Sequence, residues 1–337
     1  MRKILLFGLL VLALVGYNNA WSVTKVGTTA APFLSIGVGA RAIAMGGSFV
    51  SLANDATAMY WNPAGIARLP RNEITLNHTK WIADINYNYV GAVFQFGESG
   101  TIGANMTYLS MGEMERTTEQ DPEGMGEKFS VGSFAIGLSY ARNLTDRFSI
   151  GFNAKYIQEH IWHCKATGLA VDIGTLFTTQ FNGLRIGMSI SNFGTKMQMM
   201  GSDLLVQKDI SPIAGNNPNI NANLSTDKYD LPLLMRVGVS MDVLRNGDSW
   251  LTLSVDANHP NDNTECLNLG GEYCFNEFLF LRGGYKSLYT QDTEEGATLG
   301  AGLKCRIASR ATIKVDYAWE SFGRFDNIQK LSLGMSF

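Results

Sequence analysis

Hydrophobic and polar residues alternate along most of the chain from residue 73 onward. The clearest example is the segment 330–337, where Leu331, Leu333, Met335 and Phe337 are separated by serine or glycine. Alternation with a period of two places successive side chains on opposite faces of a β-strand. The pattern therefore predicts a sheet protein whose strands have one apolar and one polar face.

The same alternation predicts about fourteen strands, and no amphipathic helical period follows residue 70. The predicted strands lie near residues 73–81, 86–96, 101–110, 129–142, 148–160, 166–178, 184–192, 232–244, 249–257, 265–274, 278–286, 297–306, 311–319 and 329–337. An even number of strands is typical of bacterial outer-membrane β-barrels.

The polar faces of several predicted strands carry charges at mid-strand. Examples are Arg236, Asp242, Asp256, Lys314 and Asp316. A dry sandwich core would reject such charges unless they were paired, whereas the polar lumen of a barrel accepts them. The charges therefore favour an all-β, antiparallel transmembrane β-barrel over a soluble sandwich.

The connections between the predicted strands alternate in length. Short ones, such as 97–100 and 143–147, follow even strands, and long polar ones, notably 111–128 and 193–231, follow odd strands. The first hairpin is the only brief exception to this parity. Short periplasmic turns and long extracellular loops are typical of transmembrane barrels, so the parity predicts a barrel whose amino terminus starts in the periplasm.

Two further features fit a barrel in the outer membrane. Aromatic residues near strand ends, such as Trp81, Tyr87 and Tyr89, suit the girdles at membrane interfaces. The terminal Phe337 lies on an apolar face and matches the last residue of such barrels, where it serves as an outer-membrane assembly signal.

Residues 1–20 have the pattern of a secretory signal peptide. Arg2 and Lys3 precede an apolar run that is too short to span a bilayer as a helix, and we expect cleavage after Ala20. No later run of about 18 apolar residues follows. The mature protein is therefore expected to leave the cytoplasm and to contact outer-membrane lipid.

Composition narrows the function classes. The formal net charge of −3 gives no broad attraction to nucleic acid, so we expect no nucleic-acid partner. The 36 glycines are many for a soluble enzyme built from helices. These values suit a sheet protein in which backbones approach closely.

The stretch 33–69 is crowded with glycine and alanine. Its Gly37–Ala42 run approximates the turn of a dinucleotide site, with Asp55 at about the spacing of a ribose-binding acid. Such a site needs a βαβ unit followed by helices, which the downstream strands do not provide. We therefore disfavour an oxidoreductase, expect no cofactor, and expect the small residues to allow close packing against the barrel wall.

This stretch resembles the opening of the PorV/PorQ group within the FadL-like (FadL/TodX) outer-membrane barrel superfamily. The resemblance rests on a dense set of residues between the signal peptide and the first strand. They are Gly39, Arg41, Met45, Gly46, Gly47, Asn54, Asp55, Trp61, Asn62, Pro63, Ala64 and Gly65. It implies a hatch, or plug, over residues 21–72 that fills the lumen of a barrel over residues 73–337.

The resemblance also implies a role in protein export. PorV-type barrels accept the carboxy-terminal signal domains of cargo from the type IX secretion system, so the expected partners are secreted cargo proteins and type IX secretion components. The alternative is a FadL-like transporter for long-chain fatty acids or other hydrophobic small molecules. The chain is shorter than those transporters, and its segment 215–230 is polar, which favours export.

The long connection 193–231 is the candidate ligand or cargo loop. Its first half carries adaptable apolar residues, namely Met197, Met199, Met200, Leu204, Leu205 and Val206. Methionine-rich surfaces suit contact with varied partners. The loop is hypothesised to line an external cavity that receives a peptide or an apolar ligand; the alternative is that it folds over its own barrel mouth.

Arg41 and Asp55 are the charged residues of the predicted plug. We expect them to pair with lumen residues and so to hold the plug in place. The candidates are Asp172, Arg236, Asp242, Asp256, Lys314 and Asp316.

Histidine and cysteine give little evidence of chemistry. His160, His163 and Cys164 have a spacing that suits zinc, but on an extended chain the two histidines face opposite ways, so no metal site is expected. The four histidines share no motif with a serine, so no catalytic residue is expected and the chain is not read as an enzyme. Cys266 and Cys274, on one predicted strand, would lie about 26 Å apart, too far for a disulfide.

Overall fold

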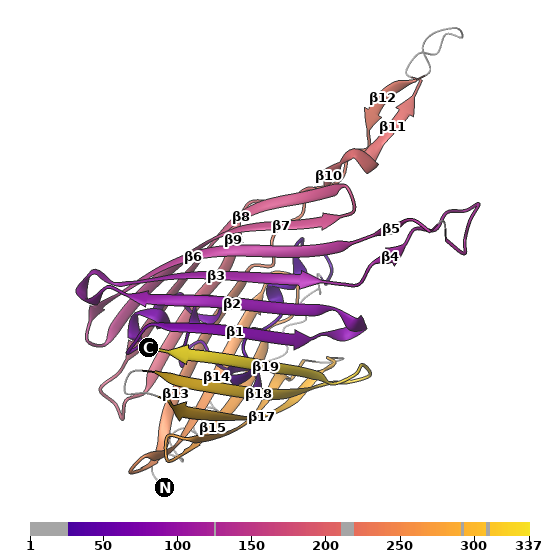
Figure 1. The fold of residues 1–337 in the computed structure, drawn as a ribbon. Coiled ribbons are helices and arrows are strands. Elements are labelled where there is room, and N and C mark those ends of the chain that lie inside the picture. The colour runs from indigo at the N-terminus through magenta and orange to yellow at the C-terminus, as the bar shows by residue number, and fades with distance from the viewer. Residues whose placement is uncertain (1–25, 125, 210–218, 291–292, 308–310) are drawn as a thin grey trace.

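Fourteen antiparallel strands form a closed barrel (Figure 1). The computed structural model describes residues 26–337 except 125, 210–218, 291–292 and 308–310, and this count refers to that part of the chain. Barrel strands that follow one another in the chain also pair in the sheet, and β1 pairs with β19 to close the ring. The strands are β1 Glu73–Lys80, β2 Asn86–Gln95, β3 Thr101–Ser110, β6 Val131–Thr145, β7 Phe148–Ile161, β8 Cys164–Thr178, β9 Arg185–Gly194, β13 Leu234–Asn246, β14 Ser249–Pro260, β15 Cys266–Phe275, β16 Leu279–Leu288, β17 Glu295–Arg306, β18 Thr312–Phe322 and β19 Ile328–Ser336.

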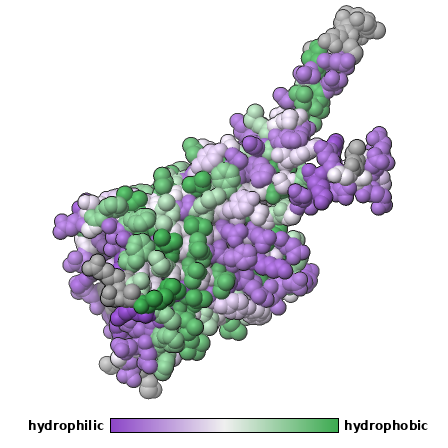
Figure 2. Space-filling view, in the orientation of Figure 1, coloured by the Kyte–Doolittle hydropathy of each residue, from purple (hydrophilic) through white to green (hydrophobic). Residues whose placement is uncertain are grey.

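The strand predictions are confirmed. Each predicted strand is present, and no bound differs by more than three residues. In β19, Leu331, Leu333 and Met335 point outward and are exposed, whereas Lys330 and Ser332 point into the lumen and are buried. Outward apolar side chains of this kind form the hydrophobic band across the face of the barrel seen in Figure 2, with polar surface toward both ends. Such a band matches the hydrocarbon layer of a membrane.

The two ends of the barrel differ. The short-turn end holds the connections after β2, β6, β8, β13, β15 and β17, and the long-loop end holds the others. At the long-loop end, β4 (Met114–Glu115) pairs with β5 (Lys128–Phe129), and β11 (Leu205–Lys208) pairs with β12 (Ile220–Asn223). Both hairpins project away from the barrel (Figure 1).

The prediction of a single brief connection at the long-loop end is wrong. Only Trp162 and His163 join β7 to β8, so this hairpin has an even shorter turn than the first one. Pairing continues up to Ile161 and Cys164, because both strands keep their alternation beyond the barrel rim. The turn closes with Trp162 in the left-handed region, at φ 52°.

The inner segment, residues 28–69, lies inside the barrel. It contains η1 (Pro32–Ser35), α2 (Ala40–Ala44), α3 (Ala58–Trp61) and η2 (Pro63–Arg68), and most of its side chains are buried. Three further single turns lie outside it: η3 (Ile82–Asp84), η4 (Gly97–Ser99) and η5 (Ser202–Leu204). Across the described residues, every helix falls short of the length and apolarity that crossing a membrane requires.

The inner segment runs from the long-loop end to the short-turn end. Thr29 forms a bridge with Asp230 in a long connection, and Glu73 begins β1 at the opposite end. The first strand therefore starts at the short-turn end, as the parity predicts, but the chain that precedes it comes from the other end of the lumen. The predicted signal peptide, 1–20, lies outside the described residues.

Candidate functional site

Glycines of the barrel wall hold the inner segment closely. Among the described residues, nine of them, on nine different strands, would place a Cβ atom within 3.0 Å of an inner-segment atom. They are Gly91, Gly103, Gly151, Gly174, Gly187, Gly238, Gly270, Gly284 and Gly300. At four of them, Gly151, Gly187, Gly270 and Gly284, the nearest inner-segment atom belongs to the backbone, so a side chain there would displace the segment from the wall. At Gly91 and Gly103 it belongs to the end of the Met59 side chain, which can move.

The glycines of the inner segment itself have the same cause. Gly46, at φ 66°, would place a Cβ 2.4 Å from the carbonyl oxygen of Leu269 on β15. A Cβ on Gly65 would lie 1.8 Å from the carbonyl oxygen of Ala53, within the segment. The predicted close packing of the Gly- and Ala-rich stretch is therefore present, both against the wall and within the segment.

Asn62 and Pro63 form the turn that begins η2. The buried Asn62 side chain donates to the carbonyl oxygens of Val50 (2.8 Å) and Thr175 on β8 (3.0 Å), and its Oδ1 accepts from the backbone nitrogen of Ala64 at 3.2 Å. Pro63 occupies the first helical position, where no backbone donor is needed. One side chain thus caps a helix, joins two parts of the segment and ties the segment to the wall.

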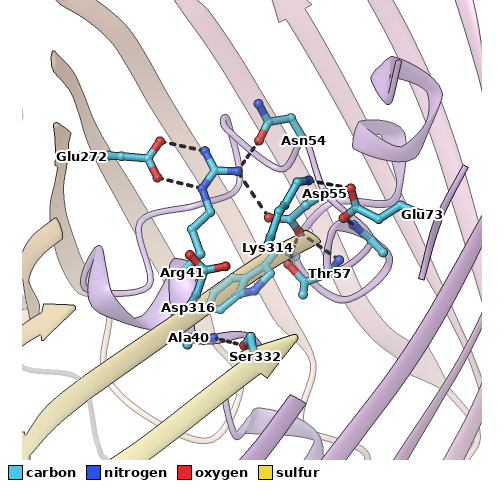
Figure 3. A network of polar contacts seen from close by, with 12 residues as sticks. Ala40, Arg41, Asn54, Asp55, Thr57, Glu73, Glu272, Lys314, Asp316 and Ser332 are labelled. Atoms are coloured by element: carbon cyan, nitrogen blue, oxygen red, sulfur yellow. Dashed lines mark hydrogen bonds and ion pairs between the residues drawn. The ribbon is translucent and has the colours of Figure 1, made fainter. Parts of the chain in front are cut away.

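Arg41 is the centre of a charged network at the short-turn end of the segment (Figure 3). Its guanidinium makes two hydrogen bonds of 2.8 Å to Glu272 on β15, one of 2.7 Å to Asn54, and an ion pair of 3.3 Å with Asp55. Asp55 also accepts from the backbone nitrogen of Thr57 at 2.9 Å. Burial alone would lower the pKa of Arg41, but the carboxylates of Glu272 and Asp55 more than offset this and raise it above its ordinary value.

Arg41 pairs with a lumen residue, as predicted, but not with one of the six named as examples. Its partner is Glu272. Four of the six pair within the wall instead: Asp172 with Lys155, Asp242 with Arg185, Lys314 with Glu73, and Asp316 with Arg282. Alternation along β15 places Glu272 inward, but only the path of the inner segment brings Arg41 to it.

The other two named residues do hold the segment, without an ion pair to Arg41 or Asp55. The buried carboxylate of Asp256 accepts from the backbone nitrogens of Phe49 (2.7 Å) and Val50 (2.8 Å). The guanidinium of Arg236 lies over the rings of Tyr60 and Trp61, at 5.3 and 5.1 Å from their centroids. Trp61 also donates to the carbonyl oxygen of Val38 at 2.8 Å.

Two of the residues assigned to an interfacial girdle lie in the lumen instead. Tyr87 and Tyr89 on β2 are buried, and they donate to the carbonyl oxygens of Ile36 (2.9 Å) and Ala56 (3.3 Å). The alternation of β2 turns both rings inward, which closeness to a strand end does not reveal.

The candidate cargo loop divides into two parts. Met197 is buried in the same hydrophobic cluster as Phe33 and Leu34 of the inner segment, and Met199 packs on that cluster. Met200, in β10 (Met200–Gly201), and Leu205, in β11, are exposed, and Leu204 lies between them in η5. The first part therefore covers the barrel mouth. In the second part, Met200 pairs with Lys165 on β8, and the β11–β12 hairpin that follows projects away from the barrel.

The remaining candidates lie apart from this arrangement. His163 lies in the turn between β7 and β8, and its Nδ1 is 2.9 Å from the carboxylate of Asp203 in η5. The described residues contain no group of three or more His, Cys, Asp or Glu side chains placed to hold a metal. Cys266 and Cys274 stand near opposite ends of β15, and all four cysteines have free thiols. Phe337 is exposed after β19, and its backbone nitrogen donates to Asn72 at 3.0 Å.

Comparison with known proteins gives a family and a fold. The family model of the type IX secretion system protein PorV matches residues 19–259. A UPF0164 protein of Treponema pallidum (strain Nichols) is 25% identical over 171 residues, which are 48% of this chain and 43% of that relative. The match thus spans less than half the length of the relative.

The structural likeness extends further along the chain. The Pseudomonas putida toluene transporter TodX superposes with a TM-score of 0.57 at 12% identity, over 89% of this chain and 97% of that one. A TodX monoaromatic hydrocarbon channel mutant (deltaS2S3) gives a TM-score of 0.54 at 13% identity, over 89% and 98%. At these identities the likeness shows the fold alone, which is that of a TodX-type outer-membrane barrel.

Proposed function

The chain belongs to the PorV family of type IX secretion system proteins, and from this premise we propose that it binds the carboxy-terminal signal domains of secreted cargo. It is an outer-membrane β-barrel, so its short-turn end faces the periplasm and its long-loop end faces the exterior. The family and the fold are non-enzymatic, and the proposal includes no catalysis.

The observation that carries the proposal is the filled lumen. The inner segment closely approaches glycines on nine strands, four of them through its backbone, and Arg41, Asn62 and Asp256 fasten it to the wall. A solute could cross the barrel only if these contacts were broken together. We propose that the inner segment is a permanent plug and that the protein acts through its outer surface.

The outer end offers surface suited to binding another protein. The connection after β9 carries the exposed apolar side chains Met200, Leu205 and Leu224 beyond the barrel mouth. Apolar side chains that project into water favour contact with a partner, because association removes them from solvent. Their place outside the hydrophobic band supports a protein partner rather than lipid.

A retention assay tests the proposal. The full chain, purified in detergent, would be immobilised and exposed to the carboxy-terminal signal domain of a type IX cargo from the same genome. We expect the domain to be retained, and a variant lacking residues 200–224 to retain less of it. The matched control lacks 114–129, the other projecting hairpin. Failure of the intact barrel to retain any such domain contradicts the proposal.

Hydrophobic-solute transport is the second candidate, and the likeness to the toluene transporter TodX favours it. The two functions predict opposite results in one assay. Cells that express the chain should take up toluene no faster than cells that lack it, because in this proposal the inner segment closes the lumen. Faster uptake that persists without residues 200–224 would favour transport over cargo binding.

A further inference from the structure

A cavity of about 520 Å³ lies between the inner segment and the wall at the periplasmic end. Arg41, Asn54 and Asp55 line it from the inner segment. The wall contributes residues next to the short turns, among them Arg245 near the end of β13 and Arg306 at the end of β17. Its volume falls in the range of about 300–1,000 Å³ that small-molecule sites occupy.

The lining of this cavity is positive although the chain is not. Eight lysine and arginine residues line it against five acidic ones, whereas the whole chain carries a net charge of −3. Cations gathered in a cleft with low-dielectric walls concentrate anions there. The cavity therefore attracts negative ligands at an end of the barrel that the cargo proposal leaves without a role.

The five carboxylates do not neutralise this excess. Each lies within 3.3 Å of a lining cation, and four cations engage all five; Arg41, for example, pairs with both Asp55 and Glu272. Arg245 and Arg306 have no carboxylate partner among the described residues. Within the part of the chain that the structure describes, no carboxylate therefore competes with an entering anion for these two guanidinium groups.

An apolar surface adjoins the charges. Trp250 and Phe280 line the cavity with ring centroids 6.4 Å apart, in an edge-to-face arrangement. The guanidinium of Arg245 lies 5.8 Å from the ring of Trp250, and that of Arg282 lies 5.2 Å from the ring of Phe280. A guanidinium fork beside an aromatic ring suits a carboxylate carried on an aromatic or aliphatic body.

We infer that this cavity is a binding site for organic carboxylates that approach from the periplasm. The carboxylate can belong to a free small acid or to the acidic side chains of a periplasmic protein segment, since both present the same group to Arg245 and Arg306. The inference goes beyond cargo binding, because it concerns the opposite end of the barrel.

Isothermal titration of the full chain in detergent tests the inference with three probes. They are succinate, the peptide acetyl-Asp-Phe-Asp-amide and its neutral counterpart acetyl-Asn-Phe-Asn-amide. We expect an acidic probe to bind, more weakly as salt is raised, and the neutral peptide not to. Binding of succinate points to a small acid, and preference for the acidic peptide points to a protein segment.

Variants connect the binding to the cavity. The double substitution R245Q/R306Q should weaken binding of the acidic probe by about tenfold or more, which corresponds to about 1.4 kcal/mol. The control K128Q removes an exposed cation at the outer end and should leave binding unchanged. Equal binding by the double variant, equal binding of the neutral peptide, or no binding of either acid at about 1 mM would overturn the inference.

Discussion

Gly46 of the inner segment and Gly284 of β16 face each other so closely that a Cβ atom on Gly284 would lie 2.2 Å from the backbone nitrogen of Gly46. Neither position has room for a side chain, so the backbones of the inner segment and the wall lie directly against each other there. Similar contacts on other strands surround the segment. Barrel and inner segment therefore depend on each other's shape, which the following substitutions test.

Valine at position 284 should unseat the inner segment. Its side chain would overlap the backbone of Gly46, and overpacking of a closed interior costs about 1–3 kcal/mol. We expect G284V to lower the free energy of unfolding by that amount and to expose the segment to limited proteolysis. The control is G283V, one residue away on the outer face, where the nearest atom to a Cβ would be 3.7 Å away. Equal behaviour of the two variants would show that the close contact has no role.

Removal of the Arg41 side chain should loosen the short-turn end of the plug. Glu272, with its side chain 3% exposed, would keep Arg282 as a partner at 2.7 Å but lose both bonds from Arg41. Loss of one partner from a buried pair costs about 3 kcal/mol, and we expect R41A to destabilise the barrel by up to that amount. Planar-bilayer recordings should show raised conductance.

The control for this variant is K80A, which breaks the exposed pair between Lys80 and Asp84. Exposed pairs contribute about 0–1 kcal/mol, so K80A should match the unsubstituted chain in conductance. If R41A also conducts no more than the unsubstituted chain, Arg41 does not hold the plug.

Alanine at position 62 should weaken the middle of the plug. The carbonyl oxygens of Val50 and Thr175 would lose their donor and η2 would lose its cap. Each buried group left unsatisfied costs about 1–3 kcal/mol. N62A should therefore unfold at lower urea concentration than N88A, which removes a hydrogen bond to His78 on the outer face. The reverse order of stability would contradict the role given to Asn62.

Local patterns predict the barrel well and the contacts of the plug poorly. Alternation depends only on which face of a strand meets lipid, so Leu331, Leu333 and Met335 are placed correctly from sequence. The pairing of Arg41 with Glu272 joins residues 231 apart in the chain, and no local period encodes it. Tyr87 and Tyr89 show the same limit, because their rings contact the inner segment rather than the membrane interface.

Met197 and Met200 should separate the stability of the outer mouth from its binding of cargo. Met197 is 1% exposed and lies in the buried cluster that includes Phe33 and Leu34, so M197A should lower the free energy of unfolding by about 2 kcal/mol or more. Met200 is 66% exposed beyond the rim, so M200A should change stability by less than about 0.5 kcal/mol.

In the retention assay we expect M200A, combined with L205A, to retain less cargo signal domain while the barrel unfolds as before. Full retention by that double variant, together with weak retention by M197A, would assign cargo binding to the barrel mouth instead of the exposed side chains of Met200 and Leu205. Since the two methionines are only three residues apart, the comparison isolates burial from position in the chain.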